Sequence, residues 1–180
     1  MFSHRVSSDI HLKLLEPRDS EELFKVTDGS RDYLREWLPW VDGTRTVEDS
    51  KSFIQMTINQ YASNNGFQAG IWFNDSLVGC IGFHAIDWSN RRTSVGYWLG
   101  QGFQGHGIMT KATEAMVDIA FEEYKLNRVE ILAAVGNQKS RAIPERLGFQ
   151  QEGCLRQYEW LYDHFVDHVV YTMLASEWKG

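Results

Sequence analysis

The sequence is poor in cysteine and lacks the patterns that bind metals through cysteine or histidine. Its 180 residues contain two cysteines, Cys80 and Cys154, and neither a Cys-x-x-Cys nor a His-Glu-x-x-His motif. These absences argue against a disulfide framework and against a zinc site. His164 and His168 stand four apart in a strand pattern, which is not a metal-binding arrangement, so no metal is predicted. Because free cysteines are usually buried, we expect both thiols to lie inside strands.

Long apolar runs and a positive net charge are also absent. The longest apolar-rich run, residues 77–86, is far shorter than the roughly 18 residues that a membrane-spanning helix needs. We therefore expect a cytoplasmic protein without a membrane partner. The 18 basic and 24 acidic residues give a net charge of -6, which argues against direct binding to nucleic acid and suits a cationic or amine partner.

The spacing of apolar residues predicts one α+β domain over residues 1–180, since no repeat, low-complexity tract or linker divides the chain. Alternating and β-branched segments predict seven strands, at 10–14, 67–73, 77–88, 91–99, 128–135, 150–161 and 165–174. Capping residues and helical spacing predict helices from Asp19 to near Gly29, from about Ser30 through Leu38, from Thr46 to about 64, after Gly107, and from 137 to 146.

The segments 91–99 and 128–135 are joined by one of these helices, so they are predicted to pair in parallel as a single βαβ crossover. The other strands follow one another through short turns, which favours antiparallel pairing. The expected architecture is a single mixed, mostly antiparallel central sheet of about seven strands with helices on both faces.

A glycine loop leads directly from the strand at 91–99 into a helix. Gly105 and Gly107 can adopt positive φ, so successive backbone N–H groups can converge on one anion, and the helix adds its unpaired N–H groups and the positive end of its dipole. The spacing fits neither a Walker loop nor a dinucleotide fingerprint. A turn followed by a helix start explains the same residues equally well; if the loop binds phosphate, a different phosphate-bearing ligand is needed.

Six short motifs follow one another along nearly the whole chain. They are Trp37-Leu38-Pro39-Trp40, Gly96-Tyr97-Trp98-Leu99, Gln104-Gly105-His106-Gly107-Ile108-Met109, Asn137-x-x-Ser140, Leu147-Gly148-Phe149 and Glu152-Gly153-x-Leu155-Arg156. In this order they resemble the GCN5-related N-acetyltransferase (GNAT) superfamily, whose loop has the pattern Gln/Arg-x-x-Gly-x-Gly/Ala. Within it they resemble the branch of ribosomal-protein N-terminal acetyltransferases of the RimJ/RimL type.

Two residues depart from the family pattern. Met109 replaces the small residue that ends the loop motif, a departure associated with the ribosomal-protein branch. Pro144 stands in a helix where the family keeps a good helix former, and it has no N–H to donate. That helix is therefore predicted either to begin late, with Ser140 near its N-cap, or to be kinked.

The resemblance implies that the chain binds acetyl-CoA as acetyl donor. The pyrophosphate would bind the backbone N–H groups of Gln104, Gly105, His106, Gly107, Ile108 and Met109 and the Thr110 hydroxyl, with local positive charge from Lys111, Lys139, Arg141 and Arg146. The pantetheine arm would lie between Tyr97, Trp98 and Leu99 on one strand and the Val135 end of the other, and Asn137 would bond its amides. Gly96 would form a bulge that opens this gap, and an N–H near Trp98 or Leu99 would polarise the thioester carbonyl.

The resemblance also implies which residues handle protons. Glu159 is the predicted general base, and the alternative is an exposed strand carboxylate. Ser140 is the predicted acid for the leaving thiolate, and the alternative is a helix N-cap, although one serine can do both. Histidine is the usual base near neutral pH, but no role is assigned to His84, His106, His164 or His168.

Trp37, Trp40 and Tyr158 are expected to line the acceptor site, although the two tryptophans fit a corner of the core equally well. Direct attack of an amine on acetyl-CoA, without an acyl-enzyme, is predicted because no Cys or Ser is evident beside a histidine base. The branch implies the N-terminal α-amine of a ribosomal protein as acceptor. The alternatives are a small amine such as an amino acid, polyamine or aminoglycoside, and a CoA-binding sensor without turnover. The edge at 165–174 favours a homodimer or larger homo-oligomer.

Overall fold

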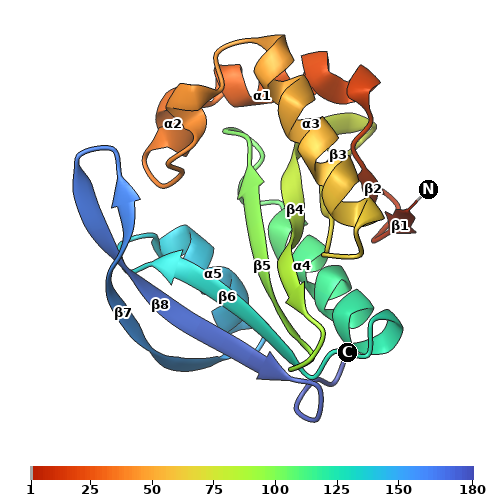
Figure 1. The fold of residues 1–180 in the computed structure, drawn as a ribbon, viewed down its shortest axis with the longest axis vertical. Helices are drawn as coiled ribbons and strands as arrows, with labels where there is room; N and C mark the ends of the chain where they lie inside the picture. Colours follow the sequence, from red (N-terminus) through yellow and green to blue (C-terminus); the bar gives the residue numbers. More distant parts are fainter. Residues whose placement is uncertain (1) are drawn as a thin grey trace.

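The computed structural model describes residues 2–180, which form one eight-stranded sheet in the order β1-β2-β3-β4-β5-β6-β8-β7 (Figure 1). Neighbouring strands are antiparallel except for β5 and β6, which are parallel, as predicted. The strands are β1 (Ser3–Arg5), β2 (Ile10–Leu14), β3 (Gln68–Phe73), β4 (Ser76–Asp87), β5 (Arg92–Leu99), β6 (Arg128–Ala134), β7 (Gln150–Leu161) and β8 (His164–Leu174).

The sheet has one strand more than predicted. The segment 165–174, predicted to be an edge, lies in the inner strand β8, and the edges of the sheet are β7 and β1. β1 pairs with β2, with Ser3 opposite Lys13. It is three residues long and polar, so it carries no alternation of apolar and polar residues by which it could be recognised.

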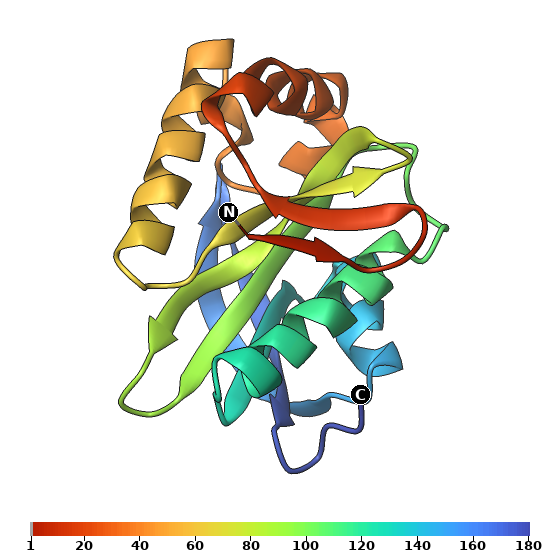
Figure 2. The same cartoon turned by 90° about the vertical axis from the view of Figure 1, so that its right-hand side faces the viewer.

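Five α-helices lie on the two faces of the sheet. They are α1 (Ser20–Gly29), α2 (Arg31–Arg35), α3 (Val47–Ala62), α4 (Ile108–Asp118) and α5 (Gln138–Arg146). The shorter helical segments are the 3-10 helices η1 (Pro17–Asp19) and η2 (Val41–Gly43) and the π-helix η3 (Ile119–Glu123). Figure 2 shows α3 and α4 on opposite sides of the strands. The larger core joins α4 to the sheet through residues such as Val95, Met116 and Ile131. The smaller core joins Leu23 of α1 and Ile54 of α3 to Trp72 and Cys80.

α3 begins as predicted and buries less than predicted. The Thr46 side chain accepts a hydrogen bond from the Asp49 amide, and the Asp49 carboxylate accepts one from the Thr46 amide at 2.8 Å, which is a capping box. The helical spacing of Phe53, Ile54, Met56, Ile58 and Tyr61 predicts one apolar stripe. Ile54 is fully buried, but Met56 and Tyr61 are exposed. The buried side of this helix is therefore narrower than the spacing of its apolar residues indicates.

α2 ends at Arg35 and does not include Trp37 or Leu38, contrary to prediction. Pro39 disfavours the helical conformation at Leu38, so the chain turns before it. The expectation for the cysteines is half right. Cys80 is buried, and burial raises the pKa of its thiol, whereas Cys154 on the edge strand β7 is exposed.

One half of the sheet is covered on one face only. α5 lies behind β6 and β8 in Figure 1, and no helix within residues 2–180 covers the side of β6, β8 and β7 that faces the viewer. We call this side, which continues across Ser94 of β5, the open face. None of the helices in the described part of the chain is both long and apolar enough to cross a membrane.

Candidate active site

The parallel strands β5 and β6 pair at one end only. Arg92, Thr93 and Ser94 lie opposite Arg128, Val129 and Glu130, and no further pairs follow. Beyond Ser94, β5 remains bonded to β4 through Leu99, and β6 remains bonded to β8 through Ala134. We call the unpaired region between the C-terminal halves of β5 and β6 the split. It is the place where an extended ligand can add as a pseudo-strand.

The predicted bulge at Gly96 is not found. The irregular register lies in β4, between Phe83 and Ile86, and Gly96 pairs regularly with Gly82. Position 96 requires glycine for a different reason: a Cβ there would lie 2.4 Å from Nε2 of His84. The split therefore follows from the ending of the β5–β6 register and does not require a distortion of β5.

The glycine loop at the end of β5 has the predicted backbone. Gly102, Gly105 and Gly107 have φ values of 95°, 83° and 69°, and nothing lies within 4 Å of a Cβ built on any of them. Gly105, His106 and Gly107 are exposed. Gly107 is the N-cap of α4. Within residues 2–180, no acceptor bonds the amides of residues 104–107, and the first amides of α4 have no partner inside the helix.

Two side chains hold the loop and its surroundings in place. The Gln104 side chain donates to the Gly100 carbonyl and accepts from the Gly102 amide, both at 2.9 Å, so it braces the loop from within. The Thr110 hydroxyl accepts a hydrogen bond from Arg146 of α5 at 3.2 Å. Arg146 thus brings a positive charge to the N-terminus of α4, where an anion would bind.

The N-terminus of α5 lies beside the split and differs from the expectation. Its N-cap is Asn137, whose side chain accepts from the Ser140 amide at 3.2 Å, so Ser140 is not the cap and the helix does not begin late. Pro144 lies inside the helix and leaves the Ser140 carbonyl without its usual i+4 donor. The Tyr97 hydroxyl donates to this carbonyl at 2.9 Å, and Ser140 Oγ lies 3.5 Å from the same hydroxyl. Burial raises the pKa of Tyr97, which keeps it protonated as the donor.

The segment containing Trp37 and Trp40 joins the two sides of the split. The ring of Trp37 lies 2.9 Å from the position of a Cβ on Gly136, just after β6. The ring of Trp40 lies 5.6 Å from that of Trp98, on β5. The two indoles thus meet opposite strands and do not pair with each other. Their segment therefore contacts both sides of the split near its C-terminal end.

The turn between β7 and β8 is attached to the same segment. The Tyr162 hydroxyl donates to the Leu38 carbonyl, and the guanidinium of Arg35 lies 3.8 Å from the centre of the Tyr162 ring. Arg35 also forms two hydrogen bonds to Asp42. These contacts hold the β7–β8 hairpin beside the split.

Glu159 lies on the open face next to a histidine that the sequence did not connect to it. Its Oε1 lies 3.6 Å from Nε2 of His168, whose register partner is Ala134 at the end of β6. Both ring nitrogens of His168 are buried and make no hydrogen bond to the described residues. Tyr158 is exposed and lies 5.1 Å from the His168 ring. The predicted base and Tyr158 therefore lie together near the C-terminal end of the split.

A second histidine contact was also missed. Nδ1 of His84 lies 2.9 Å from Oγ of Ser94, the last residue of β5 that pairs with β6. A serine beside a histidine is thus present, contrary to the premise from which direct attack was predicted. The only signal in the sequence was a strand histidine preceding a strand serine, and the β4–β5 register that joins them is a long-range property.

The site combines unpaired backbone amides, the split between β5 and β6, the Glu159 carboxylate, the Ser140 hydroxyl and the indole rings of Trp37 and Trp40. Amides of this kind bind phosphate, and the split can hold an extended thiol-bearing arm, which together suit a coenzyme A thioester. Among the residues that the structure describes, no group of three or more His, Cys, Asp or Glu side chains is placed to hold a metal ion.

Comparison with known proteins agrees with this geometry. Residues 9–150 match the family model described as "Acetyltransferase (GNAT) domain". The chain is 40% identical over 181 residues to the "Putative ribosomal N-acetyltransferase YdaF" of Bacillus subtilis (strain 168), covering 100% of this chain and 99% of that protein. It is 28% identical to the ribosomal-protein-serine acetyltransferase of Escherichia coli (strain K12), covering 96% of each.

Solved structures have a similar overall fold. RimL, a ribosomal L7/L12 α-N-protein acetyltransferase in complex with coenzyme A, matches with a TM-score of 0.92 at 25% identity, over 96% of this chain and 98% of that chain. The microcin C7 self-immunity acetyltransferase MccE, in complex with acetyl-CoA and AMP, matches with a TM-score of 0.90 at 28% identity, over 94% of each.

Proposed function

The chain belongs to the GNAT family of acetyltransferases, and from this we propose that it transfers the acetyl group of acetyl-CoA to the N-terminal α-amine of a ribosomal protein. The observation that carries the proposal is the row of amides at residues 104–107 that have no partner among residues 2–180, of which residues 105–107 are exposed, at the end of β5 beside the split. We take residues 1–180 as one acetyltransferase domain, since relatives align with it over their full length.

In this proposal the loop holds the donor. The amides of Gln104, Gly105, His106, Gly107, Ile108 and Met109 bind the pyrophosphate, with the Thr110 hydroxyl and Arg146 beside them. The pantetheine arm adds to the split next to Tyr97, Trp98 and Leu99. An amide of Trp98 or Leu99 polarises the thioester carbonyl. The Asn137 Oδ1 caps α5, so its side-chain NH₂ is the group that remains to bond the pantetheine.

The chemistry needs an uncharged amine and a proton for the thiolate. An α-amine titrates near 8 and a lysine amine above 10, so an N-terminal acceptor asks less of a base. Glu159 takes the proton of the acceptor ammonium through a water molecule, and Ser140 gives a proton to the sulfur. Trp37, Trp40 and Tyr158 line the path of the acceptor. The acceptor class is supported by the ribosomal-protein substrates that the names of the relatives state.

Incubation with acetyl-CoA and intact ribosomal proteins, followed by peptide mapping, tests this proposal. We expect a new acetyl group on one or a few protein N-termini. Acetylation of lysine side chains alone, or of free amino acids, polyamines or aminoglycosides in preference to proteins, contradicts the proposed acceptor. Thermal stabilisation by acetyl-CoA without release of CoA to any amine contradicts turnover and indicates a sensor.

A further inference from the structure

We propose that His84 is a second proton acceptor in this reaction, and that its Nε2 takes the proton that leaves the nitrogen as the amide forms. The inference rests on the proposed function and adds a residue to it.

His84 lies in the bulge of β4, and its side chain lies on the open face. The register between β4 and β5 shifts between Phe83 and Ile86, so two residues lie between the regular pairs. Gln60 of α3 fixes this irregular backbone, because its side-chain NH₂ donates to the Phe83 carbonyl at 2.9 Å and also to the His84 carbonyl. Bulges of this kind occur next to active sites, where they redirect a side chain.

The imidazole is oriented at one nitrogen and free at the other. Nδ1 contacts Ser94 Oγ at 2.9 Å, while Nε2 has no partner among residues 2–180. A Cβ on Gly96 would lie 2.4 Å from Nε2 and 2.5 Å from Cε1, so the ring lies directly over Gly96. Glycine at this position is what admits the ring. When Nδ1 donates to Ser94, the lone pair of the imidazole is on Nε2.

His84 is closer in the sheet to the expected acyl group than Glu159 is. Gly96 and Trp98 point to the same face of β5, and the amides of Trp98 and Leu99 are the proposed partners of the thioester carbonyl. β4 is next to β5, whereas β7 is three strands away in the order β5-β6-β8-β7. At about 4.8 Å per paired strand, three steps from β5 to β7 already make roughly 14 Å, and the unpaired split between β5 and β6 adds to the separation of the Glu159 backbone from β5. Glu159 can therefore reach an incoming ammonium through water, and His84 is placed to act at the bond being formed.

The reaction requires two protons to leave the nitrogen. The ammonium of the acceptor loses the first to Glu159, and the amine then forms a C–N bond with the carbonyl carbon, which leaves a positive nitrogen and an oxyanion. His84 takes the second proton. Collapse of the oxyanion breaks the C–S bond, and the thiolate takes a proton from Ser140. Ser140 then regains a proton from protonated Glu159 or protonated His84. One proton is released in total, which balances the conversion of an ammonium and a thioester to an amide and a thiol.

The surroundings favour the neutral, proton-accepting form of His84. The residue is exposed as a whole, but protein on the Gly96 side of its ring removes water and lowers the pKa of His84. The groups bonded to this residue are both uncharged: Ser94 of β5 contacts the ring, and the side chain of Gln60 of α3 bonds the His84 carbonyl. Glu130 of β6 is the register partner of Ser94, but its carboxylate accepts a hydrogen bond from Arg128 at 2.7 Å.

The test compares His84→Gln with His11→Gln, which removes an imidazole from β2, two strands away from β4. We expect His84→Gln to lower kcat/KM about 100-fold, as for loss of a general base, with an unchanged Kd for acetyl-CoA by calorimetry. The acidic limb of the pH profile should change, and His11→Gln should resemble the wild type. Ser94→Ala, which removes only the orienting contact, should lose about tenfold and shift the ¹⁵N resonances of the His84 ring.

The outcomes separate the two proposals. If the wild type acetylates ribosomal proteins and His84→Gln keeps its rate and pH profile, the role of His84 is wrong and the proposed function stands. If the wild type acetylates no amine, both are wrong. Mass spectrometry that finds an acetyl group on Ser94 during turnover makes that serine a nucleophile and overturns its role as an orienting residue.

Discussion

The two ends of the parallel pair β5–β6 are built in opposite ways. At the N-terminal end the strands are paired, and ionic side chains cross the sheet above them. At the C-terminal end the strands are apart, and backbone amides beside them lack partners among residues 2–180. One end of the crossover therefore satisfies its polar groups within the chain, and the other end, which we call the open end, does not. In the proposed function these unpaired amides bind the donor.

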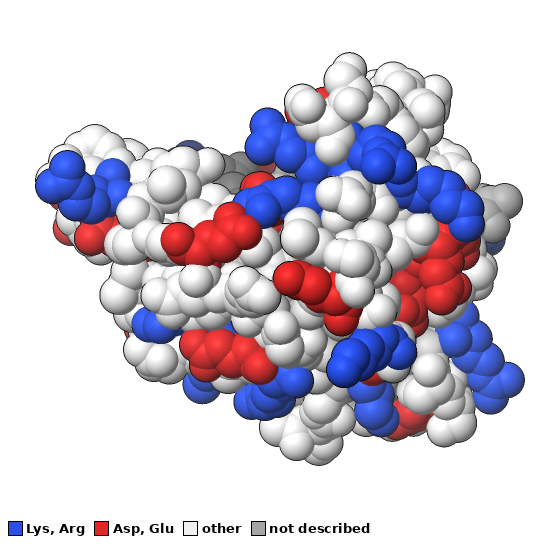
Figure 3. Space-filling model, turned by 90° about the horizontal axis from the view of Figure 1, so that it is seen from below, with Lys and Arg blue, Asp and Glu red and all other residues white. Residues whose placement is uncertain are grey.

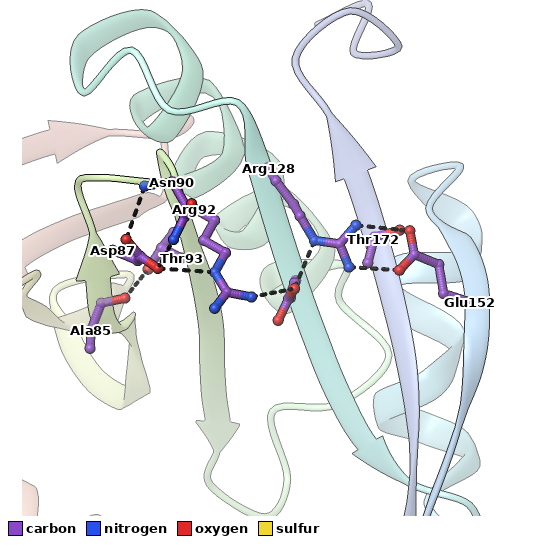
Figure 4. Close-up of polar contacts among 9 residues, drawn as sticks. Ala85, Asp87, Asn90, Arg92, Thr93, Arg128, Glu152 and Thr172 are labelled. Atoms are coloured by element: carbon purple, nitrogen blue, oxygen red, sulfur yellow. Dashed lines mark hydrogen bonds and ion pairs between the residues drawn. The ribbon is translucent and has the colours of Figure 1, made fainter.

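The paired end is closed by a row of alternating charges, shown in Figure 4. Asp87 of β4 is bonded to Arg92, which lies 4.0 Å from Glu130. Arg128 bonds Glu130 at 2.7 Å and forms two hydrogen bonds to Glu152 of β7. Viewed from below, at this end of the molecule, basic and acidic groups are interleaved and form no large field of one sign (Figure 3). The charged groups at this end therefore pair with one another, as in a structural ion-pair network.

The largest expected effect comes from Glu159→Gln, compared with Glu152→Gln on the same strand. Removing a general base should lower kcat by about 100-fold or more, while Glu152→Gln, at the paired end, should leave kcat within a factor of about two of the wild type. Steady-state release of CoA with a ribosomal protein as acceptor measures both. Equal losses in the two variants would mean that the carboxylates of β7 act only through the fold, and the contrast between the ends would not hold.

Gly107→Ala should weaken acetyl-CoA binding at least tenfold, about 1.4 kcal/mol, because the new Cβ strains a left-handed residue and enters the loop. Gly148→Ala is a matched control, since Gly148 has a φ of 78° against 69° for Gly107 and is also free of contacts within 4 Å of its Cβ position. Both variants should lose similar stability, about 1 kcal/mol. Calorimetric titration with acetyl-CoA should distinguish them, and an unchanged Kd in Gly107→Ala would contradict phosphate binding by the loop.

Local patterns predicted most of the fold. Alternation and turn residues located seven of the eight strands, and the helix between 91–99 and 128–135 correctly predicted their parallel pairing. Thr46 and Asp49 located the start of α3. These features depend on residues close together in the chain, which is why one sequence suffices to find them. The short polar strand β1 has no such pattern and was missed.

The interior of the site was less predictable, because it depends on which strands become neighbours. The contacts of His84 with Ser94 and of Glu159 with His168 follow from registers between strands and cannot be read from spacing. Pro144 left two alternatives for α5, a late start with Ser140 near the N-cap or a kink. The late start was wrong, since the helix accommodates the proline and a tyrosine from β5 bonds the carbonyl that the proline leaves free.

In α5 the Tyr97 hydroxyl takes the place of the backbone N–H that Pro144 lacks, as donor to the Ser140 carbonyl. A double-mutant cycle tests this at the C-terminal end of the β5–β6 pair. Tyr97→Phe should cost about 1 kcal/mol of the free energy of unfolding, because it leaves the Ser140 carbonyl unbonded. In a Pro144→Ala background the cost should be smaller, since the backbone N–H that this substitution restores can bond that carbonyl as in a regular helix. Urea denaturation of the four proteins measures the coupling. Additive effects would show that the tyrosine and the proline act independently.

The smallest expected effect concerns stability in acid at the paired end. Hydrogen bonds from Arg128 and Thr172 lower the pKa of Glu152 from an ordinary 4.5 to about 2. Its stabilising contribution is therefore complete above about pH 4.5 and is lost as the pH falls toward 2. Because the Glu152 side chain is 44% exposed, we expect screening to limit this contribution to roughly 1 kcal/mol or less. Thermal unfolding from pH 7 to 2 should show Glu152→Gln less stable at neutral pH and the difference from the wild type shrinking below pH 4.5. A constant difference over that range would mean that the carboxylate charge adds nothing, and that the paired end is held by its backbone register alone.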